Sequence, residues 1–127
     1  MRCYSLQRAT VMNKLLGKLD YYYPLYLERN EMFIVSLNYI SSLEEIDKFV
    51  EEHIVYLNEQ YSHGNFIVSG RKEPRTGGII LSALESKQEL ESILKSDPFY
   101  RERLAEFEII EFIPTKSAPE LNFLIDV

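Results

Sequence analysis

From Met32 onward, segments with strand character alternate with segments with helix character, and this alternation constrains the fold more than any single motif. Residues 32–39 are rich in β-branched and aromatic side chains, which predicts a largely buried strand. Further strands are expected at residues 66–69, 79–84 and 107–112, with helical patterns between the first two and between the last two. This pattern predicts an α+β domain with an antiparallel sheet.

Capping boxes predict where both long helices begin. Ser42 with Glu45 starts a helix at about Leu43, and Ser86 with Glu89 starts a second one. In the first helix, the side chains of one buried stripe recur every three or four residues: Ile46, Val50, His53, Leu57 and Tyr61. The stripe indicates one continuous amphipathic helix that ends at a left-handed stop near residues 63–65.

Turn signals surround the second helix. Residues 66–69 and 79–84 are most simply an antiparallel hairpin with a long charged tip. The Asp97-Pro98 pair predicts an N-cap and a first-turn proline for another helical turn, through about Ala105. In the last strand, the doubled Ile109-Ile110 suggests a β-bulge.

The predicted order is the split β-α-β-β-α-β arrangement of ferredoxin-like folds. It places two helices on one face of the sheet and leaves the other face bare. Because the strand at residues 32–39 is hydrophobic on both sides, the bare face carries apolar side chains. A single sheet does not leave so much apolar surface in water, so we expect a second copy of the chain to cover it in a homodimer.

The first thirty-one residues differ from the rest in charge and pattern. They hold five Lys/Arg and three Asp/Glu, a balance of +2, whereas residues 32–127 hold nine and seventeen, a balance of −8. We expect residues 1–31 to be a poorly ordered N-terminal extension or a translated leader, with Met32 as the natural start. A genuine extension whose tyrosines line a dimer surface is the alternative. One domain over residues 32–114 and a C-terminal tail over residues 115–127 follow.

Composition excludes several classes of protein. With 127 residues, 46% hydrophobic and 27% charged, the chain has the size and makeup of one globular domain. No apolar run approaches the roughly 20 residues of a membrane span, and the single cysteine, Cys3, allows no intrachain disulfide. The acidic body repels phosphate backbones, so nucleic-acid binding is not expected. We expect a cytoplasmic protein.

His53 and Asp97 have the strongest case for chemistry. Taken alone, His53 on an apolar stripe is more simply a core histidine, and Asp97 before a proline is more simply a helix cap. Because the two helices of this topology run antiparallel, the chain after the second helix returns to the level of His53, at about 1.5 Å per residue. Asp97 then lies beside His53, where a carboxylate orients the imidazole and fixes its tautomer, as a general acid/base requires.

The charged loop from Gly70 to Gly78 is the candidate for binding a substrate anion. Its Arg71 and Arg75 could hold a carboxylate or phenolate in a bidentate fork, and Ser69 and Gly70 stand at the strand end beside them. A solvated hairpin tip is an equally good interpretation. The two histidines, ten residues apart without a cysteine nearby, have no metal-ligand spacing, and we expect neither a metal nor a cofactor.

Five short stretches follow one another in a characteristic order: Glu52-His53-Ile54-Val55-Tyr56-Leu57, Ser69-Gly70-Arg71, Gly77-Gly78-Ile79-Ile80, Asp97-Pro98-Phe99 and Glu108-Ile109-Ile110-Glu111-Phe112. In this combination, residues 32 to about 114 resemble the YCII-related (YciI-like) family. The resemblance implies a dimeric α/β barrel with a histidine-aspartate pair, here His53 and Asp97, as the active site. Relatives include a dehydrochlorinase of chlorinated hydroxyquinones, and the fold is similar to that of muconolactone isomerases.

Two kinds of function are therefore expected. The first is an enzyme of proton-transfer chemistry, an isomerase or a dehydrochlorinase-like lyase, that acts on a small cyclic or carbonyl-bearing organic acid. His53 would serve as its base and acid, and Asp97 would orient His53. The second is a non-catalytic module that binds a small ligand or a partner, in which His53 is only a structural residue.

Overall fold

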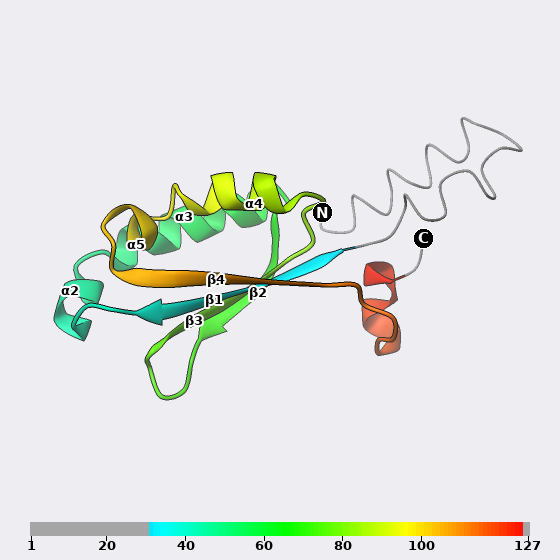
Figure 1. The fold of residues 1–127 in the computed structure, drawn as a ribbon, viewed down its shortest axis with the longest axis horizontal. Coiled ribbons are helices and arrows are strands. Elements are labelled where there is room, and N and C mark those ends of the chain that lie inside the picture. Colours follow the sequence, from blue (N-terminus) through cyan, green and yellow to red (C-terminus); the bar gives the residue numbers. More distant parts are fainter. Residues whose placement is uncertain (1–30, 126–127) are drawn as a thin grey trace, which may run out of the picture.

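The computed structural model describes residues 31–125, and its backbone follows the predicted order of strands and helices (Figure 1). The strands are β1 (Met32–Tyr39), β2 (Phe66–Arg71), β3 (Gly77–Ser82) and β4 (Ala105–Phe112). The helices are α2 (Leu43–Asp47), α3 (Val50–Ser62), α4 (Lys87–Leu94) and α5 (Pro98–Arg101), with a 3-10 helix, η2 (Pro119–Leu124), after β4. The extension or leader expected over residues 1–31 lies, apart from Glu31, outside the described residues.

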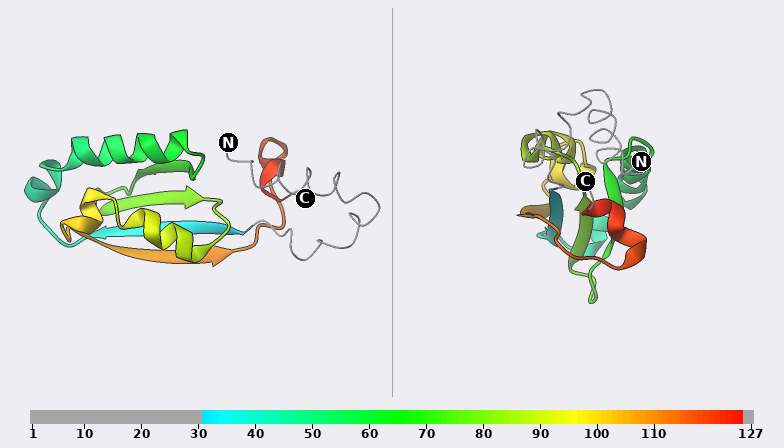
Figure 2. Two further views of the ribbon diagram at one scale, coloured as in Figure 1. Left: turned by 90° about the horizontal axis from the view of Figure 1, so that it is seen from above. Right: turned by 90° about the vertical axis from the view of Figure 1, so that its right-hand side faces the viewer.

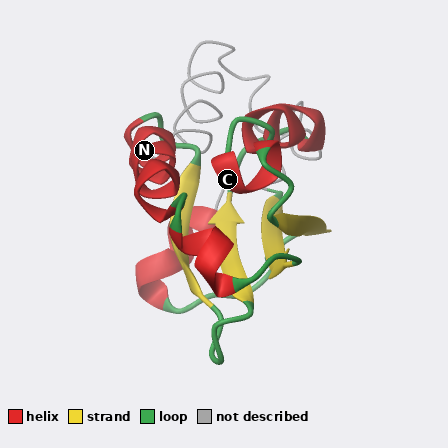
Figure 3. Ribbon diagram, turned by 90° about the vertical axis from the view of Figure 1, so that its left-hand side faces the viewer, coloured by secondary structure: helices red, strands yellow, loops and turns green. Residues whose placement is uncertain are grey.

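The four strands form one antiparallel sheet in the order β2-β3-β1-β4. The two central strands, β3 and β1, are far apart in sequence, and β2 and β4 are the edge strands. This is the ferredoxin-like order, and it confirms the predicted α+β class. In Figure 3, which views the sheet from one end, the long helices lie on one side of the strands and the β2-β3 hairpin tip extends on the other.

The helix layer covers one face of the sheet, with α3 over the β2 side and α4 over the β4 side (Figure 2). Alternate residues of β1 point into the core beneath these helices: Phe33, Val35 and Leu37 are each at most 2% exposed. The face away from the helices carries exposed apolar side chains, among them Val68 and Ile110. The sheet therefore has one face buried by helices and one open face that carries exposed apolar side chains.

The pairing of β1 with β4 runs without interruption, from Met32 opposite Phe112 to Tyr39 opposite Ala105. The bulge predicted at Ile109-Ile110 is therefore wrong. Two consecutive isoleucines reflect a strand that is apolar on both faces at this point, because successive side chains point to opposite sides. The irregular register lies in β2 instead.

The single helix predicted from Leu43 is also wrong, since a turn at Lys48-Phe49 divides it into α2 and α3. The Ser42 side chain accepts a hydrogen bond from the Glu45 N–H, so the predicted cap is present. The turn changes the phase of the stripe. The fully buried residues of α3 are Tyr56 and Gln60. Of the predicted stripe, Val50 and Leu57 are partly buried and pack against the core, whereas Tyr61 is 36% exposed.

Several strand and helix boundaries also differ from prediction. β2 ends at Arg71 rather than Ser69, β3 ends at Ser82 rather than Leu84, and β4 begins at Ala105 rather than Phe107. β3 begins at Gly77 rather than Ile79, because a Cβ at Gly77 would overlap the backbone carbonyl of Leu37 and only glycine allows the two strands to approach there. The turn of helix after Asp97 ends at Arg101, ahead of the expected Ala105. Among residues 31–125, no helix combines the length and apolar character needed to cross a membrane.

Candidate active site

Elements far apart in the sequence bring His53 and Asp97 together. His53 lies in the first turn of α3, and Asp97 is the N-cap of α5, which follows α4 as α4 runs back along α3. Their side chains meet with His53 Nδ1 2.8 Å from Asp97 Oδ1. The contact expected from the antiparallel helices is therefore present in the fold.

Asp97 holds its position through two hydrogen bonds to one oxygen. Oδ1 accepts from His53 and, at 2.9 Å, from the backbone N–H of Phe99. The residue is fully buried, and Oδ2 has no hydrogen-bond partner within residues 31–125. An ionised carboxylate only accepts, so with Asp97 ionised the contact requires the proton on Nδ1, and a neutral ring then has its free lone pair on Nε2.

Aromatic rings surround the imidazole. The Phe99 ring lies parallel to the His53 ring, with centroids 4.1 Å apart and an interplanar angle of 7°. Tyr56, three residues further along α3, places its ring 6.3 Å away at 26°. His53 nevertheless keeps 15% of its side chain exposed. The site is thus a mostly enclosed imidazole with a small opening to solvent.

The sequence interpretation missed both aromatic neighbours, although each carries a signal. Tyr56 is one helical turn from His53, and residues at that spacing lie on the same helix surface. Phe99 follows the Asp97-Pro98 cap, in the turn whose N–H groups a cap residue binds. Neither Tyr56 nor Phe99 was predicted as a site residue, because hydrophobic side chains in these patterns are interpreted as core.

Tyr56 has a buried phenol that donates a hydrogen bond to the carbonyl of Ile93 at 2.9 Å. Burial, and then the negative charge of Asp97, raise the pKa of Tyr56 well above its ordinary value. The phenol therefore stays protonated over the whole neutral range, and it can donate but cannot serve as a base.

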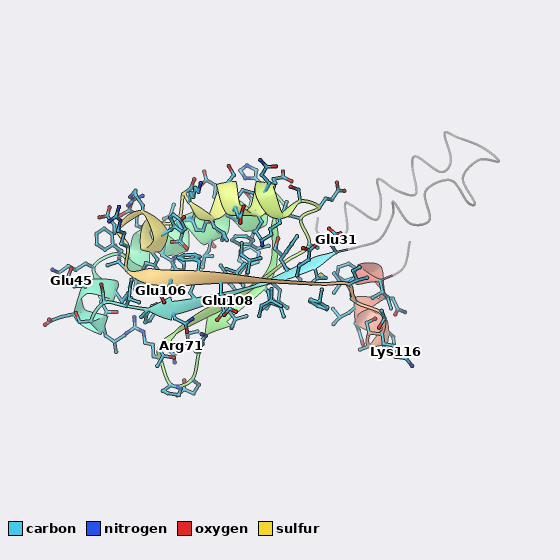
Figure 4. All side chains as sticks on the ribbon, viewed as in Figure 1. Glu31, Glu45, Arg71, Glu106, Glu108 and Lys116 are labelled. Carbon is cyan, nitrogen blue, oxygen red and sulfur yellow. The ribbon has the colours of Figure 1, made fainter. Side chains whose placement is uncertain are left out.

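The four residues predicted to bind a substrate lie around the β2-β3 hairpin, and no hydrogen bond or ion pair in the described part of the chain joins them to the dyad. Arg75 Nη2 is 2.6 Å from Asp47 Oδ1, and its pKa is raised, chiefly by that hydrogen bond. The Ser69 hydroxyl bonds to the Tyr61 hydroxyl at 2.6 Å. Gly70 and Arg71 lie at the exposed end of β2, where Figure 4 labels Arg71. Their role stays a prediction.

Lys72 belongs to the same charged loop, but it was not among the residues predicted to bind a substrate. Its Nζ donates to Ser36 Oγ at 2.9 Å and to Asn38 Oδ1 at 2.6 Å, across the open face of the sheet. Directly opposite those two acceptors in β4 stand Glu108 and Glu106, on the side away from the helices in Figure 4. The open face is therefore polar at this end, in contrast to its apolar other end.

Two hollows flank β4. One of about 730 Å³ lies at the start of β4 and includes Asn38, Tyr100, Arg103 and Glu106 in its lining. The other, of about 330 Å³, lies between α4 and β4 beside Leu94. Neither is lined by the dyad. Within residues 31–125 there is no group of three or more His, Cys, Asp or Glu side chains that could hold a metal ion.

Comparison with known proteins places the chain in a family. The family model of the YCII-related domain matches residues 32–113. Among solved structures, the chain is similar to 5-chloro-2-hydroxyhydroquinone dehydrochlorinase (TftG) from Burkholderia phenoliruptrix AC1100, in complex with 2,5-dihydroxybenzoquinone. The TM-score is 0.56 at 20% sequence identity, over 68% of this chain and 95% of that one, so the similarity concerns the fold. No curated protein sequence matches the chain. The chain belongs to the YCII-related domain family.

Proposed function

We propose that this chain is a small-molecule enzyme of proton-transfer chemistry, an isomerase or a dehydrochlorinase-like lyase that acts on a small cyclic or carbonyl-bearing organic acid. The observation that carries the proposal is the 2.8 Å contact between His53 Nδ1 and a fully buried Asp97. Family membership and the fold shared with a dehydrochlorinase support it.

In this reaction His53 acts first as base and then as acid. Nε2 takes a proton from a carbon or hydroxyl of the bound molecule, and Asp97 balances the charge of the imidazolium that forms. The electron pair left behind becomes a new double bond. In an isomerisation Nε2 returns the proton to another atom of the same molecule. In an elimination a leaving group such as chloride departs with the electron pair of its bond to carbon, and the imidazolium then gives its proton to solvent.

An anionic substrate needs a cation, and Arg71 is the better of the two predicted arginines. Arg75 is engaged by Asp47. The Arg71 side chain, in contrast, makes no side-chain hydrogen bond or ion pair with another residue of the 31–125 range, and only its backbone pairs, with Gly78 of β3. A guanidinium can bind a carboxylate or phenolate through two parallel hydrogen bonds. Arg71 is therefore assigned the anion-binding role.

A homodimer completes the proposal. On the open face, Ile34 of β1 stands between Leu81 of β3 and Ile110 of β4, so three apolar side chains adjoin across the sheet. Ile110 is 44% exposed and Phe112 is 40% exposed. Apolar residues that adjoin in this way are typical of a protein interface, and a second copy of the same face is the occupant that the pattern favours.

Two features favour the second candidate, a non-catalytic binding or interaction module. Asp97 already has a structural task as the cap of α5, and the two hollows beside β4 lie away from His53. In a binding module a ligand would raise the melting temperature of the protein without being converted.

The test is turnover and binding with a defined panel: 5-chloro-2-hydroxyhydroquinone, 2,5-dihydroxybenzoquinone and small unsaturated lactone acids. The wild type is expected to release chloride from the first compound or to isomerise a lactone. His53→Gln is expected to lower that rate by about 100-fold or more, while His63→Gln, at the exposed end of α3, leaves it unchanged. Turnover that survives in His53→Gln contradicts the assigned role.

The remaining outcomes are also decisive. Thermal shifts without turnover of any compound favour the binding module over the enzyme. If no compound of the panel is turned over and none raises the melting temperature, the proposed substrate class is wrong.

A further inference from the structure

Phe99 contacts both members of the dyad through different parts of itself. Its backbone N–H donates to Asp97 Oδ1 at 2.9 Å. Its ring lies parallel to the His53 imidazole, 4.1 Å away between centroids and tilted by only 7°. The same carboxylate oxygen accepts from His53 Nδ1, so Phe99, Asp97 and His53 form one closed set of contacts.

Phe99 is itself held firmly. It is 2% exposed and belongs to the core beneath the helices. The ring of Tyr39, at the end of β1, meets it edge to face at 5.9 Å and 90°. The Phe99 backbone lies in α5, where the side chain of Asp97 binds the N–H of the first turn. A residue fixed at both backbone and ring can transmit its position to its neighbours.

We propose that Phe99 is a positioning residue that sets the ring plane and the tautomer of His53. The inference rests on the proposed function, because it concerns how the imidazole is prepared for proton transfer. A parallel ring 4.1 Å away leaves no space for the imidazole to turn edge-on, which a rotation about its Cβ–Cγ bond requires. The ring is then confined to the orientation in which Nδ1 faces Asp97.

The consequence for chemistry is that the proton of the neutral His53 ring has a defined position, on Nδ1. With Nδ1–H donated to Asp97, the neutral ring carries its lone pair on Nε2, the nitrogen left to meet a bound molecule. A ring free to turn would divide its population between two orientations and two tautomers. Phe99 would thus act on the reaction through His53, without touching the substrate.

The competing interpretation is that Phe99 only fills the core. Both interpretations predict that its replacement lowers stability, so stability cannot separate them. They differ in the tautomer of His53, which a purely packing role does not control. Nitrogen-15 NMR of the histidine side chains reports that tautomer directly, and it needs no substrate.

The test compares Phe99→Leu with Phe107→Leu in the full chain labelled with ¹⁵N-histidine. Leucine keeps the backbone N–H and an apolar side chain but removes the flat ring. Phe107 is the matched control because it also packs against the core, while its ring contact is with Tyr100 and not with the dyad. His63→Gln assigns the two histidine spectra.

In the wild type, the neutral His53 ring is expected to be mainly the Nδ1–H tautomer. Phe99→Leu should lower the ratio of Nδ1–H to Nε2–H at least threefold, and Phe107→Leu should leave it unchanged. A folded Phe99→Leu protein with the wild-type ratio overturns the inference. If Phe99→Leu does not fold, Phe99→Met repeats the comparison, and a wild type in which Nε2–H predominates overturns it without any variant.

This readout is independent of the proposed function. Turnover that survives in His53→Gln would refute the catalytic role of His53 and leave the tautomer result standing. A His53 tautomer ratio that is unchanged in Phe99→Leu would refute the positioning role of Phe99 and leave the proposed enzyme function untouched.

Discussion

Replacement of Asp97 by alanine tests the central contact of the site. The change removes an N-cap from α5, at a cost of about 1 kcal/mol. It also removes a hydrogen bond between His53 and a charged group, which contributes about 2–3 kcal/mol. The loss of Oδ2, buried without a partner in the described chain, returns about 1 kcal/mol. We therefore expect the free energy of unfolding to fall by about 2–3 kcal/mol.

Urea unfolding of Asp97→Ala and Ser86→Ala at neutral pH measures this difference. Ser86 caps α4 by accepting from the Glu89 N–H at 3.1 Å, but it bonds to no histidine, so its replacement should cost about 1 kcal/mol. A double-mutant cycle with His53→Ala should give a coupling energy of about 1.5–3 kcal/mol. An Asp97→Ala cost equal to that of Ser86→Ala, with no coupling to His53, would refute the reasoning.

Three other perturbations test the packing, the sheet and the assembly. Burial raises the pKa of Tyr56 above its unfolded value of about 10, so above about pH 10 unfolding releases the phenol proton. The contribution of Tyr56 to the free energy of unfolding is therefore complete below about pH 10 and falls above it by up to about 1.4 kcal/mol per pH unit. Urea unfolding at about pH 8 and about pH 11 should show a shallower fall in Tyr56→Phe, and an equal fall contradicts the burial argument. Gly77→Ala should lower the free energy of unfolding by at least about 2 kcal/mol, because the new Cβ meets the Leu37 carbonyl. Gly70→Ala is the control and should change it little, because a Cβ there meets nothing within 4 Å. Equal losses of the two variants in thermal unfolding would contradict the close approach at Gly77. Ile110→Glu should halve the mass measured by light scattering if copies pair through the open face, and an unchanged dimer would place the interface elsewhere.

The sequence predicted most of the fold because its strongest signals are local. The caps at Ser42 and Ser86 and the strand at residues 32–39 all lie where the patterns put them. The division of the first helix had no such signal. Lys48 and Phe49 are ordinary helical residues, and only packing of α2 and α3 decides that a turn separates them.

The site was predictable in its polar pair and not in its aromatic frame. The approach of Asp97 to His53 follows from the topology and the helix rise, which are properties of the backbone. The stack of Phe99 on His53 depends on side-chain rotamers, and its parallel geometry emerges only when the core is packed. The pairing of Arg75 with Asp47 likewise joins the β2-β3 loop to the end of α2, and no sequence spacing specifies that approach.

Asp97 serves as a cap and as a partner of His53 through a single oxygen, and this double use decides which measurements can reveal function. A structural histidine and a catalytic one both stabilise the fold through Nδ1, so loss of stability on mutation supports neither over the other. A structural and a catalytic histidine differ in what is required of the other ring nitrogen, Nε2. A structural role is complete once Nδ1 is bonded, whereas catalysis requires Nε2 to be reachable, and His53 keeps 15% of its side chain exposed in an otherwise enclosed site. The small opening at His53 is therefore the feature that the capping role of Asp97 does not explain. Binding of a small molecule in that opening, detected by a change at Nε2, would be direct evidence for an active site.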